Sequence, residues 1–472
     1  MMDVHQLEQL RPLGKLEQVA ACCHHIDFFN NVGLSAHYKF SDSSPGVSNL
    51  RGLVYATIGA VVRQHRILAA IIVDEDAPSP HFASLPVIDL ARSVTFLERS
   101  QPLPEAVSED KELDAILEYQ HNTNFKSEYG TLPFWRLIIL QSPGVSNEFT
   151  ASFIYHHAIG DGVSGMAFHH AFRQALEVAS SNCLTVGEAE NIIFGDENGP
   201  VLPSLEELHP LPIQVPPSHP SAANLKEWTG GPVHIPCTSR WASMFLSSDT
   251  SRGFIQDCKN RNVTVTSALT SIVATILFEN LPSDVEAVTC IIPVNLRPWL
   301  RLPRQVADRA IGSYFDVTRA RIRRPARNLQ DHVWSSAAQV SQTINKYLSN
   351  ISPSGEPYTS IAIFNTIPDV SAMLKSMIGN PRDAALEVTN IGVFSRATPF
   401  NREEIPLWHV TKVLLSRSSP VTGAAITDGD IALGFSWQEG IVPPDLIGNV
   451  RQGVRKHLER KDKGREFSNL DD

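Results

Sequence analysis

The chain has 472 residues, of which 42% are apolar and 19% are charged, and its formal net charge is −10. This composition excludes extensive disorder, and the length excludes a single small core, so two large lobes or about three domains are expected. The acidic balance argues against nucleic acid as a partner, because neutralising phosphates requires a basic surface.

Cysteine usage and hydropathy favour a soluble, cytoplasmic protein. The six cysteines show no metal-ligand spacing, and six in so long a chain are expected to be reduced thiols. The longest apolar stretch, residues 53–73, is interrupted by Arg63, His65 and Arg66, which argues against a membrane-spanning helix. We therefore expect no transmembrane segment, no metal site and a monomer.

Hydrophobic periodicity in the first half predicts alternating strands and helices. Strands are expected over residues 33–40, 69–73, 135–140 and 149–157, and helices over residues 53–64, 113–119 and 165–178. The next stretch is rich in proline up to residue 220, which predicts an extended crossover, because proline lacks an amide hydrogen and disfavours a preceding helix.

The second half repeats this alternation. Strands are expected over residues 241–247, 287–294, 311–322, 410–415 and 430–437, and helices over residues 262–278, 329–348 and 446–458. The alternation predicts an α/β protein of two lobes, each a mixed sheet with covering helices. The predicted division is an N-terminal lobe over residues 1–194, a proline-rich linker over residues 195–240 and a C-terminal lobe over residues 241–472.

The segment most informative about chemistry runs from His156 to Gly162 and reads His-His-Ala-Ile-Gly-Asp-Gly. It lies between a predicted strand and a predicted helix, where a cleft can form. Alternation along a strand would send His156 and His157 to opposite faces, so only one of them is expected to reach the cleft. Histidine is the usual general base near neutral pH. Asp161, between two glycines, is expected to fix the loop without touching substrate.

Other interpretations of this segment were weighed against catalysis. A metal site would need a third ligand at a defined spacing, and none follows. A serine hydrolase would need a Gly-x-Ser-x-Gly elbow, which the chain lacks. A purely structural role stays open for His156.

The full pattern resembles the His-His-x-x-x-Asp-Gly signature of the chloramphenicol acetyltransferase-like superfamily. That superfamily includes plant BAHD acyltransferases, condensation domains and yeast-type alcohol acetyltransferases. Residues 11–17, 132–137 and 292–297 are similar to the fungal alcohol acetyltransferase branch. The Asp-Phe-Gly-Trp-Gly motif of the plant branch is absent, and its nearest counterpart is Leu-Gly-Phe-Ser-Trp at residues 433–437.

The resemblance implies two sandwiched lobes with a tunnel between them, and transfer of an acyl group, most simply acetyl, from coenzyme A to a small alcohol. It implies that His157 takes the proton of the acceptor hydroxyl, with His156, Gly162 and Arg297 in supporting positions. Asp161 is expected to pair with Arg297, since a buried arginine is rarely left unpaired. Acetyl-CoA would be a co-substrate, and no tightly bound cofactor is expected.

Two sets of residues are candidates for the remaining roles. Arg319, Arg321 and Arg323 would share one face of a strand and are candidates for the coenzyme A phosphates, with a solvated rim as the alternative. Thr389 and Asn390 are candidates for the oxyanion site, with ordinary turn chemistry as the alternative.

Two rival functions remain at this point. The chain could be a freestanding condensation-type domain that takes acyl groups from a carrier protein, although no carrier domain adjoins it. It could also be a catalytically silent relative that only binds a ligand. The acceptor, whether a small alcohol, a terpenoid or polyketide hydroxyl or an amine, is not revealed by the sequence.

Overall fold

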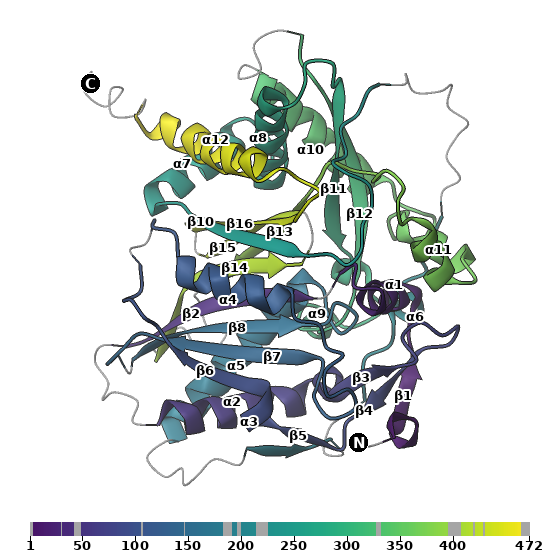
Figure 1. Cartoon of the computed structure of the whole chain (residues 1–472), viewed down its shortest axis with the longest axis vertical. Coiled ribbons are helices and arrows are strands. Elements are labelled where there is room, and N and C mark those ends of the chain that lie inside the picture. The colour runs from purple at the N-terminus through teal and green to yellow at the C-terminus, as the bar shows by residue number, and fades with distance from the viewer. Residues whose placement is uncertain are drawn as a thin grey trace.

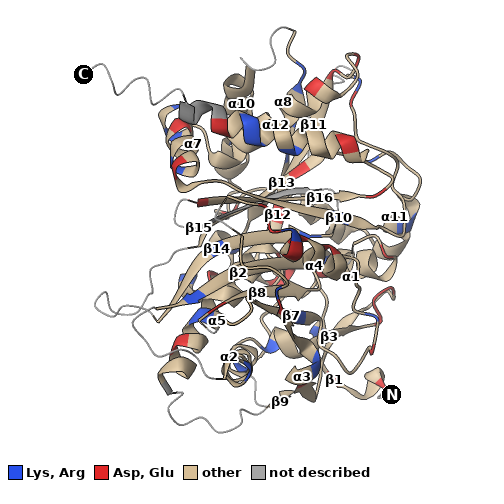
Figure 2. Cartoon of the chain, turned by 60° about the vertical axis from the view of Figure 1, so that its left-hand side comes forward, with Lys and Arg blue, Asp and Glu red and all other residues tan. Residues whose placement is uncertain are grey.

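Two stacked sheets with helices on their outer faces form the molecule (Figure 1). The computed structural model describes residues 3–29, 31–41, 49–104, 107–145, 147–182, 191–195, 200–213, 225–326, 332–394, 407–418, 421–427 and 430–463. Charged side chains lie mostly on the outer helices and loops, and the sheets between them carry few (Figure 2). The predicted α/β architecture is confirmed.

The first sheet has five strands in the order β14-β2-β8-β7-β6, all antiparallel neighbours except the parallel pair β6 and β7. Their bounds are Trp408–Arg417, Val32–Phe40, Glu148–Tyr155, Trp135–Gln141 and Val94–Glu98. Its outer face is covered by α2 (Leu50–Gln64) and α5 (Gly162–Asn182) (Figure 1). Helix α2 begins where the side chain of Asn49 accepts the N–H of Gly52, which satisfies one of the free amide groups of the first turn.

The second sheet has six strands in the order β10-β16-β15-β13-β11-β12. Their bounds are Ser239–Phe245, Asp430–Gln438, Val421–Thr427, Leu386–Phe394, Ala287–Asn295 and Phe315–Arg323. Its outer face carries α7 (Ser248–Asn260), α8 (Val265–Asn280), α10 (Val333–Ser349) and α12 (Pro444–Lys463). Thr264 caps α8 by accepting the N–H of Ser267, as its position before an apolar run predicts.

Smaller elements cover the edges of the two sheets. A three-stranded sheet joins β1 (Glu8–Pro12), β4 (His81–Ser84) and β3 (Ala70–Val73), and a two-stranded one joins β5 (Val87–Asp89) and β9 (Ile192–Phe194). The remaining helices are α1 (Lys15–His25), α3 (Leu90–Ser93), α4 (Lys111–His121), α6 (Leu205–Leu208), α9 (Arg304–Ala307) and α11 (Val370–Ser376). The 3-10 helices include η1 (Val4–Gln6), η2 (Arg66–Ala69), η4 (Arg297–Trp299) and η6 (Ile361–Thr366).

The predicted division of the chain into contiguous lobes needs a correction. Strand β14 belongs to the predicted C-terminal lobe, residues 241–472, yet it pairs along its length with β2 in the first sheet. Its apolar side chains, such as Trp408 and Val410, are buried in the core of the first lobe. Hydrophobic periodicity predicts that a strand exists but not which edge it joins, so the exchange of β14 between lobes was not foreseen.

The two sheets lie close together where β16 passes β14. A Cβ placed on Gly434 of β16 would lie 2.6 Å from the carbonyl oxygen of Leu415 and 2.1 Å from the ring of Trp241. Only a residue without a side chain lets the two backbones come this close. Glycine at this position therefore sets the spacing of the lobes beside the cavity described below.

Helix α4 protects the outer edge of the second sheet. The carboxylates of Glu118 and Asp114 accept the backbone N–H groups of Trp241 and Ser243 in the edge strand β10. A helix of the first lobe thus satisfies donors that an open edge would leave exposed. Among the described residues, no single helix is long and apolar enough to cross a membrane, although α7 and α8 together, bent by 102°, reach the same length and composition.

Candidate active site

The His-His segment forms a tight loop rather than the end of a strand. Strand β8 ends at Tyr155, two residues earlier than predicted, so both histidines follow it. The backbone carbonyl of His156 accepts the N–H of Ile159, and its Nδ1 accepts the N–H of Ala158 at 3.0 Å. The N–H of His156 still donates to the carbonyl oxygen of Phe134 beside β7, and the bonds within the loop follow after it. His156 is fully buried, whereas His157 reaches a cavity, so the two side chains do take different directions.

The imidazole of His157 is oriented with one nitrogen available. Its Nδ1 lies 3.0 Å from the carbonyl oxygen of Gly160, so Nδ1 carries the hydrogen and Nε2 keeps its lone pair. No hydrogen bond to Nε2 is found within the described part of the chain. The rings of Phe29 and Phe315 flank the imidazole, with centroids 5.3 and 5.6 Å away. This is the tautomer that a general base needs.

The surroundings of His157 keep it neutral. Burial lowers the pKa of His157, and the positive charge of Arg417 lowers it further. Asp161 and Glu387 act in the opposite direction but do not reverse the shift. The imidazole is therefore unprotonated near neutral pH and able to accept a proton.

Asp161 and Arg297 form the predicted pair. The carboxylate accepts Nη1 of Arg297 at 2.8 Å and Nη2 at 3.0 Å, and both residues are almost completely buried. It also accepts the N–H and hydroxyl of Ser164 and the N–H of Tyr314. Burial raises the pKa of Asp161, but Arg297 and these hydrogen bonds outweigh it and hold that pKa below its usual value. Asp161 thus fixes the loop behind His157, with its acceptor sites filled by protein.

Arg297 also explains why β12 starts later than predicted. Its guanidinium donates to the carbonyl oxygens of Ala310 and Gly312, and the hydroxyl of Ser313 donates to the carbonyl oxygen of His157. Residues 310–314 therefore wrap around the guanidinium and the loop, and the strand begins only at Phe315. The predicted strand over residues 311–322 was too long at its start.

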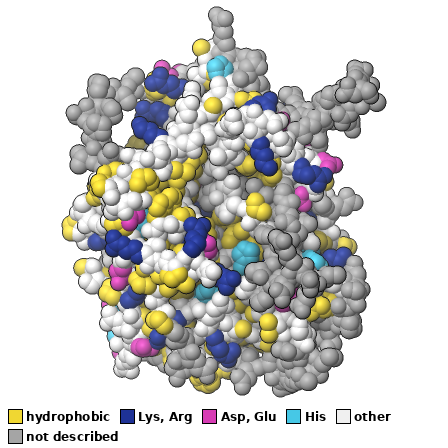
Figure 3. Space-filling view, turned by 180° about the vertical axis from the view of Figure 1, so that it is seen from behind, with side chains coloured by type: hydrophobic (Ala, Val, Ile, Leu, Met, Phe, Trp, Pro, Cys, Tyr) yellow, Lys and Arg dark blue, Asp and Glu magenta, His cyan; other side chains and the backbone are white. Residues whose placement is uncertain are grey.

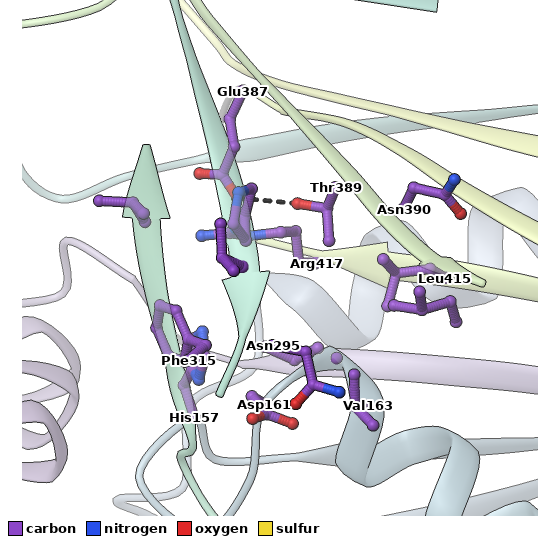
Figure 4. A pocket seen from close by; sticks show the side chains of 16 residues that line it. His157, Asp161, Val163, Asn295, Phe315, Glu387, Thr389, Asn390, Leu415 and Arg417 are labelled. Carbon is purple, nitrogen blue, oxygen red and sulfur yellow. Dashed lines mark hydrogen bonds and ion pairs between the residues drawn. The ribbon is translucent and has the colours of Figure 1, made fainter. Parts of the chain in front are cut away.

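The cavity in front of His157 is lined by both lobes (Figure 4). It encloses about 690 Å³ of empty space, its open mouth included. Its wall includes Val32, Val163, Pro293, Val317, Ile391 and Leu415 on the apolar side and Asn295, Glu387, Thr389, Asn390 and Arg417 on the polar side. Gly162 belongs to the same wall, where an added Cβ would lie 3.0 Å from the side chain of Ile391. A mainly apolar cavity with few polar groups suits a small organic acceptor.

The two oxyanion candidates line this cavity, but their polar groups are directed to protein partners. The hydroxyl of Thr389 donates to Glu387 at 2.8 Å. The side-chain amide of Asn390 donates to the hydroxyl of Thr266 at 3.1 Å and accepts the N–H of Gly392 at 3.0 Å. In Figure 4 the amide of Asn390 points away from His157. The hydroxyl of Thr389 is directed to Glu387 and the amide of Asn390 to Thr266, so neither donor is aimed at His157 in this arrangement.

The three candidate arginines do share one face of β12. They continue the alternation of Phe315 and Val317, which line the cavity, so the row leads outward from the site. Arg319 pairs with Asp383 and Arg321 with Glu227, all on the surface or near it. Arg323 is exposed and has no partner among the described residues. Figure 3 shows a short row of Lys and Arg side chains near the top of the back face, on the side where Figure 1 places β12.

One group of three side chains within the described residues has the spacing of a metal site. Ligand atoms of His24, Glu75 and His156 lie within 4.8 Å of one another. However, Nε2 of His24 accepts the N–H of Phe125 at 2.9 Å, and Nδ1 of His156 accepts that of Ala158. A neutral imidazole that accepts at one nitrogen carries its hydrogen on the other, so both nitrogens facing Glu75 are donors. The group is a carboxylate between two imidazole donors rather than a ligand set.

Four polar or aromatic residues of the cavity were not singled out from the sequence. Phe315, Glu387 and Arg417 lie in strands β12, β13 and β14, and β13 was not predicted at all. Asn295 stood in a stretch noted for its resemblance, without a role of its own. Of these four residues, only Asn295 could have been found from the sequence, because it lies two residues before Arg297 in that stretch.

Comparisons with known proteins agree with this geometry. A family model described as alcohol acetyltransferase matches residues 107–419. The chain is 60% identical over 462 residues to the probable alcohol acetyltransferase crmB of Aspergillus fumigatus, covering 95% of this chain and 99% of that protein. It is 22% identical over 437 residues to the probable alcohol acetyltransferase FCK4 of Fusarium pseudograminearum, covering 85% and 84%.

Solved structures share the fold at low sequence identity. The trichothecene 15-O-acetyltransferase TRI3 of Fusarium sporotrichioides matches with a TM-score of 0.70 and 13% identity, over 97% of this chain and 98% of that one. The first condensation domain of the calcium-dependent antibiotic synthetase matches with a TM-score of 0.59 and 12% identity, over 96% of each chain. These matches confirm the expected two-lobed architecture.

Proposed function

The chain belongs to the alcohol acetyltransferase family, and we propose that it moves an acetyl group from acetyl-CoA to a hydroxyl of a small secondary-metabolite alcohol. The observation that carries this proposal is the free Nε2 of His157, which faces a cavity that both lobes line. When the Nδ1 hydrogen of a neutral imidazole is bonded to a carbonyl oxygen, Nε2 has a lone pair that can accept the proton of a hydroxyl group.

The proposed reaction needs no covalent enzyme intermediate. Nε2 of His157 takes the hydroxyl proton while the acceptor oxygen bonds to the thioester carbon, and the carbonyl π electrons move to its oxygen. The tetrahedral oxyanion then re-forms the carbonyl as the carbon–sulfur bond breaks. The coenzyme A thiolate leaves and recovers the proton from His157. Holding both substrates at one imidazole supplies much of the rate advantage.

The row Arg319, Arg321 and Arg323 supports binding of the coenzyme A phosphates. The row lies on the same face of β12 as Phe315 and Val317, which line the cavity. The coenzyme A part of a thioester bound at His157 could therefore extend along it. Surface pairs such as that of Arg319 with Asp383 are weak and can be exchanged for phosphate contacts at small cost. All these groups come from one chain, so the proposal invokes a monomer. No step of the proposed reaction uses a metal.

The proposal is tested by release of free thiol from acetyl-CoA in the presence of a panel of alcohols, with His157→Ala as the control. Turnover by the native chain and not by the variant supports it. Turnover only when the acetyl group is carried on a pantetheinylated carrier protein would favour the condensation-type rival. No turnover with any donor, together with tight binding of a ligand, would favour a silent relative.

A further inference from the structure

Asn295 lines the same cavity as His157, the proposed base. It is the last residue of β11 and pairs across the ladder with Phe315, the ring that flanks His157. Its side chain lines the cavity, and Figure 4 places it between Asp161 and Val163, with its oxygen on the side of Asp161 and its nitrogen on the side of Val163. The register of two strands thus brings this amide to the wall of the cavity that His157 also lines.

The orientation of the Asn295 amide is fixed by Arg297. Its Oδ1 accepts the backbone N–H of Arg297 at 3.1 Å and Nη1 of the same residue at 3.2 Å. Two donors at one atom require that atom to be the oxygen, so the amide cannot be flipped without losing both bonds. Its Nδ2 therefore points the other way, and among the described residues no acceptor is found for it.

The contrast with the other asparagine of the cavity is informative. The amide nitrogen of Asn390 donates to the hydroxyl of Thr266, as described above. Asn295 is exposed to the cavity and keeps both hydrogens for a ligand. Arg297 meanwhile holds Asp161 behind the base, so one buried guanidinium positions both the His157 loop and the Asn295 amide. A donor held in this way loses little freedom when it meets its acceptor.

We propose that Nδ2 of Asn295 donates a hydrogen bond to the thioester carbonyl oxygen and stabilises the oxyanion that forms on it. This inference rests on the proposed acetyl transfer and names the donor that Thr389 and Asn390 do not supply. The electron pair that arrives on the carbonyl oxygen when the acceptor attacks makes that oxygen a stronger acceptor than in the ground state. The bond therefore strengthens in the transition state and raises kcat rather than affinity.

The test compares Asn295→Ala, Asn295→Asp and the matched control Asn449→Ala, in which an exposed asparagine of α12 that donates to Asn280 is replaced. The aspartate keeps an oxygen for Arg297 but has no hydrogen to donate, whereas alanine removes both functions. For each variant, kcat, the dissociation constant of acetyl-CoA and the melting temperature are measured. We expect both Asn295 variants to lose about 10² to 10³ in kcat with acetyl-CoA affinity little changed, and the control to stay within a few-fold of the native enzyme.

Three results would overturn the inference. The first is an Asn295→Asp or Asn295→Ala enzyme with kcat close to that of the native chain. The second is a loss confined to KM, which would make Asn295 an acceptor-binding residue. The third is a loss in both variants that follows the melting temperature, which would make the role structural. If the native chain itself fails with every alcohol, the proposed acetyl transfer fails instead.

Discussion

Arg417 of β14 and Glu387 of β13 form an ion pair that bridges the two sheets over the cavity. The two residues also exert opposite effects on the base, because Arg417 lowers the pKa of His157 and Glu387 raises it. The guanidinium lies over the ring of Phe29, with Cζ 4.8 Å from its centroid, and Phe29 in turn flanks His157. A contact between the lobes is thereby coupled to the protonation of His157, the proposed base.

This coupling predicts opposite pH shifts for two neutral substitutions. The base must be unprotonated, so activity falls as the pH drops through the pKa of His157, which lies below its usual value. Arg417→Gln removes the charge that lowers this pKa and should move the acid limb of kcat/KM to higher pH. Glu387→Gln should move it to lower pH. Profiles of kcat/KM against pH check both, and shifts in the same direction would contradict the assignment.

A second prediction concerns the buried pair of Asp161 and Arg297. Removing one partner leaves the other charge buried alone, so Asp161→Ala and Arg297→Ala should each cost about 3 to 5 kcal/mol of unfolding free energy and also lose activity. The double variant should lose less than the sum. Urea unfolding of the three variants measures this coupling. The surface pair of Arg304 with Asp308 is the control, and Arg304→Ala should change stability by less than about 1 kcal/mol.

A third prediction separates the two neighbouring histidines. His157→Ala should lower kcat by about 10² to 10⁴ and leave acetyl-CoA binding largely intact, because a base acts in the transition state. His156→Ala should act mainly on stability, since its ring is fully buried and accepts the N–H of Ala158. Calorimetric titration with acetyl-CoA and thermal melting distinguish the two effects. A folded but inactive His156→Ala beside an active His157→Ala would reverse the assignment.

A fourth prediction concerns the arginine row on β12. Changing Arg319, Arg321 and Arg323 together to glutamine should raise the KM for acetyl-CoA and weaken its salt dependence, with kcat little changed. Arg252→Gln on α7, whose partner is the surface residue Asp249, is the control.

Acetyl-dephospho-CoA, which lacks the 3′-phosphate, sharpens this experiment. If the row binds that phosphate, the triple variant and the native chain should differ much less with the shortened donor. An unchanged KM for acetyl-CoA in the triple variant would remove the row from the binding site and leave it as a solvated rim.

The fold class and many of the elements can be predicted from the sequence, and the same pattern proposes His157 as the general base. Local patterns suffice for this, because the bounds of a strand such as β2 or a helix such as α2 follow from which side chains must be buried. The pairing of Asp161 with Arg297 was also predictable, since a charge placed after a buried strand needs a partner. The elements follow from local patterns, whereas Asp161 lies 136 residues from Arg297, and the family resemblance supported it as the partner.

The residues that surround His157 follow from contacts in the folded chain. Strand β14 crosses to the first sheet and brings Arg417 over the cavity, and the register of β11 with β12 sets Asn295 opposite Phe315. Thr389 and Asn390 do reach the cavity, yet hydrogen bonds to Glu387 and Thr266 occupy their donors. Strand order, register and the use of each hydrogen are settled by contacts between segments far apart in sequence, and no local pattern records them.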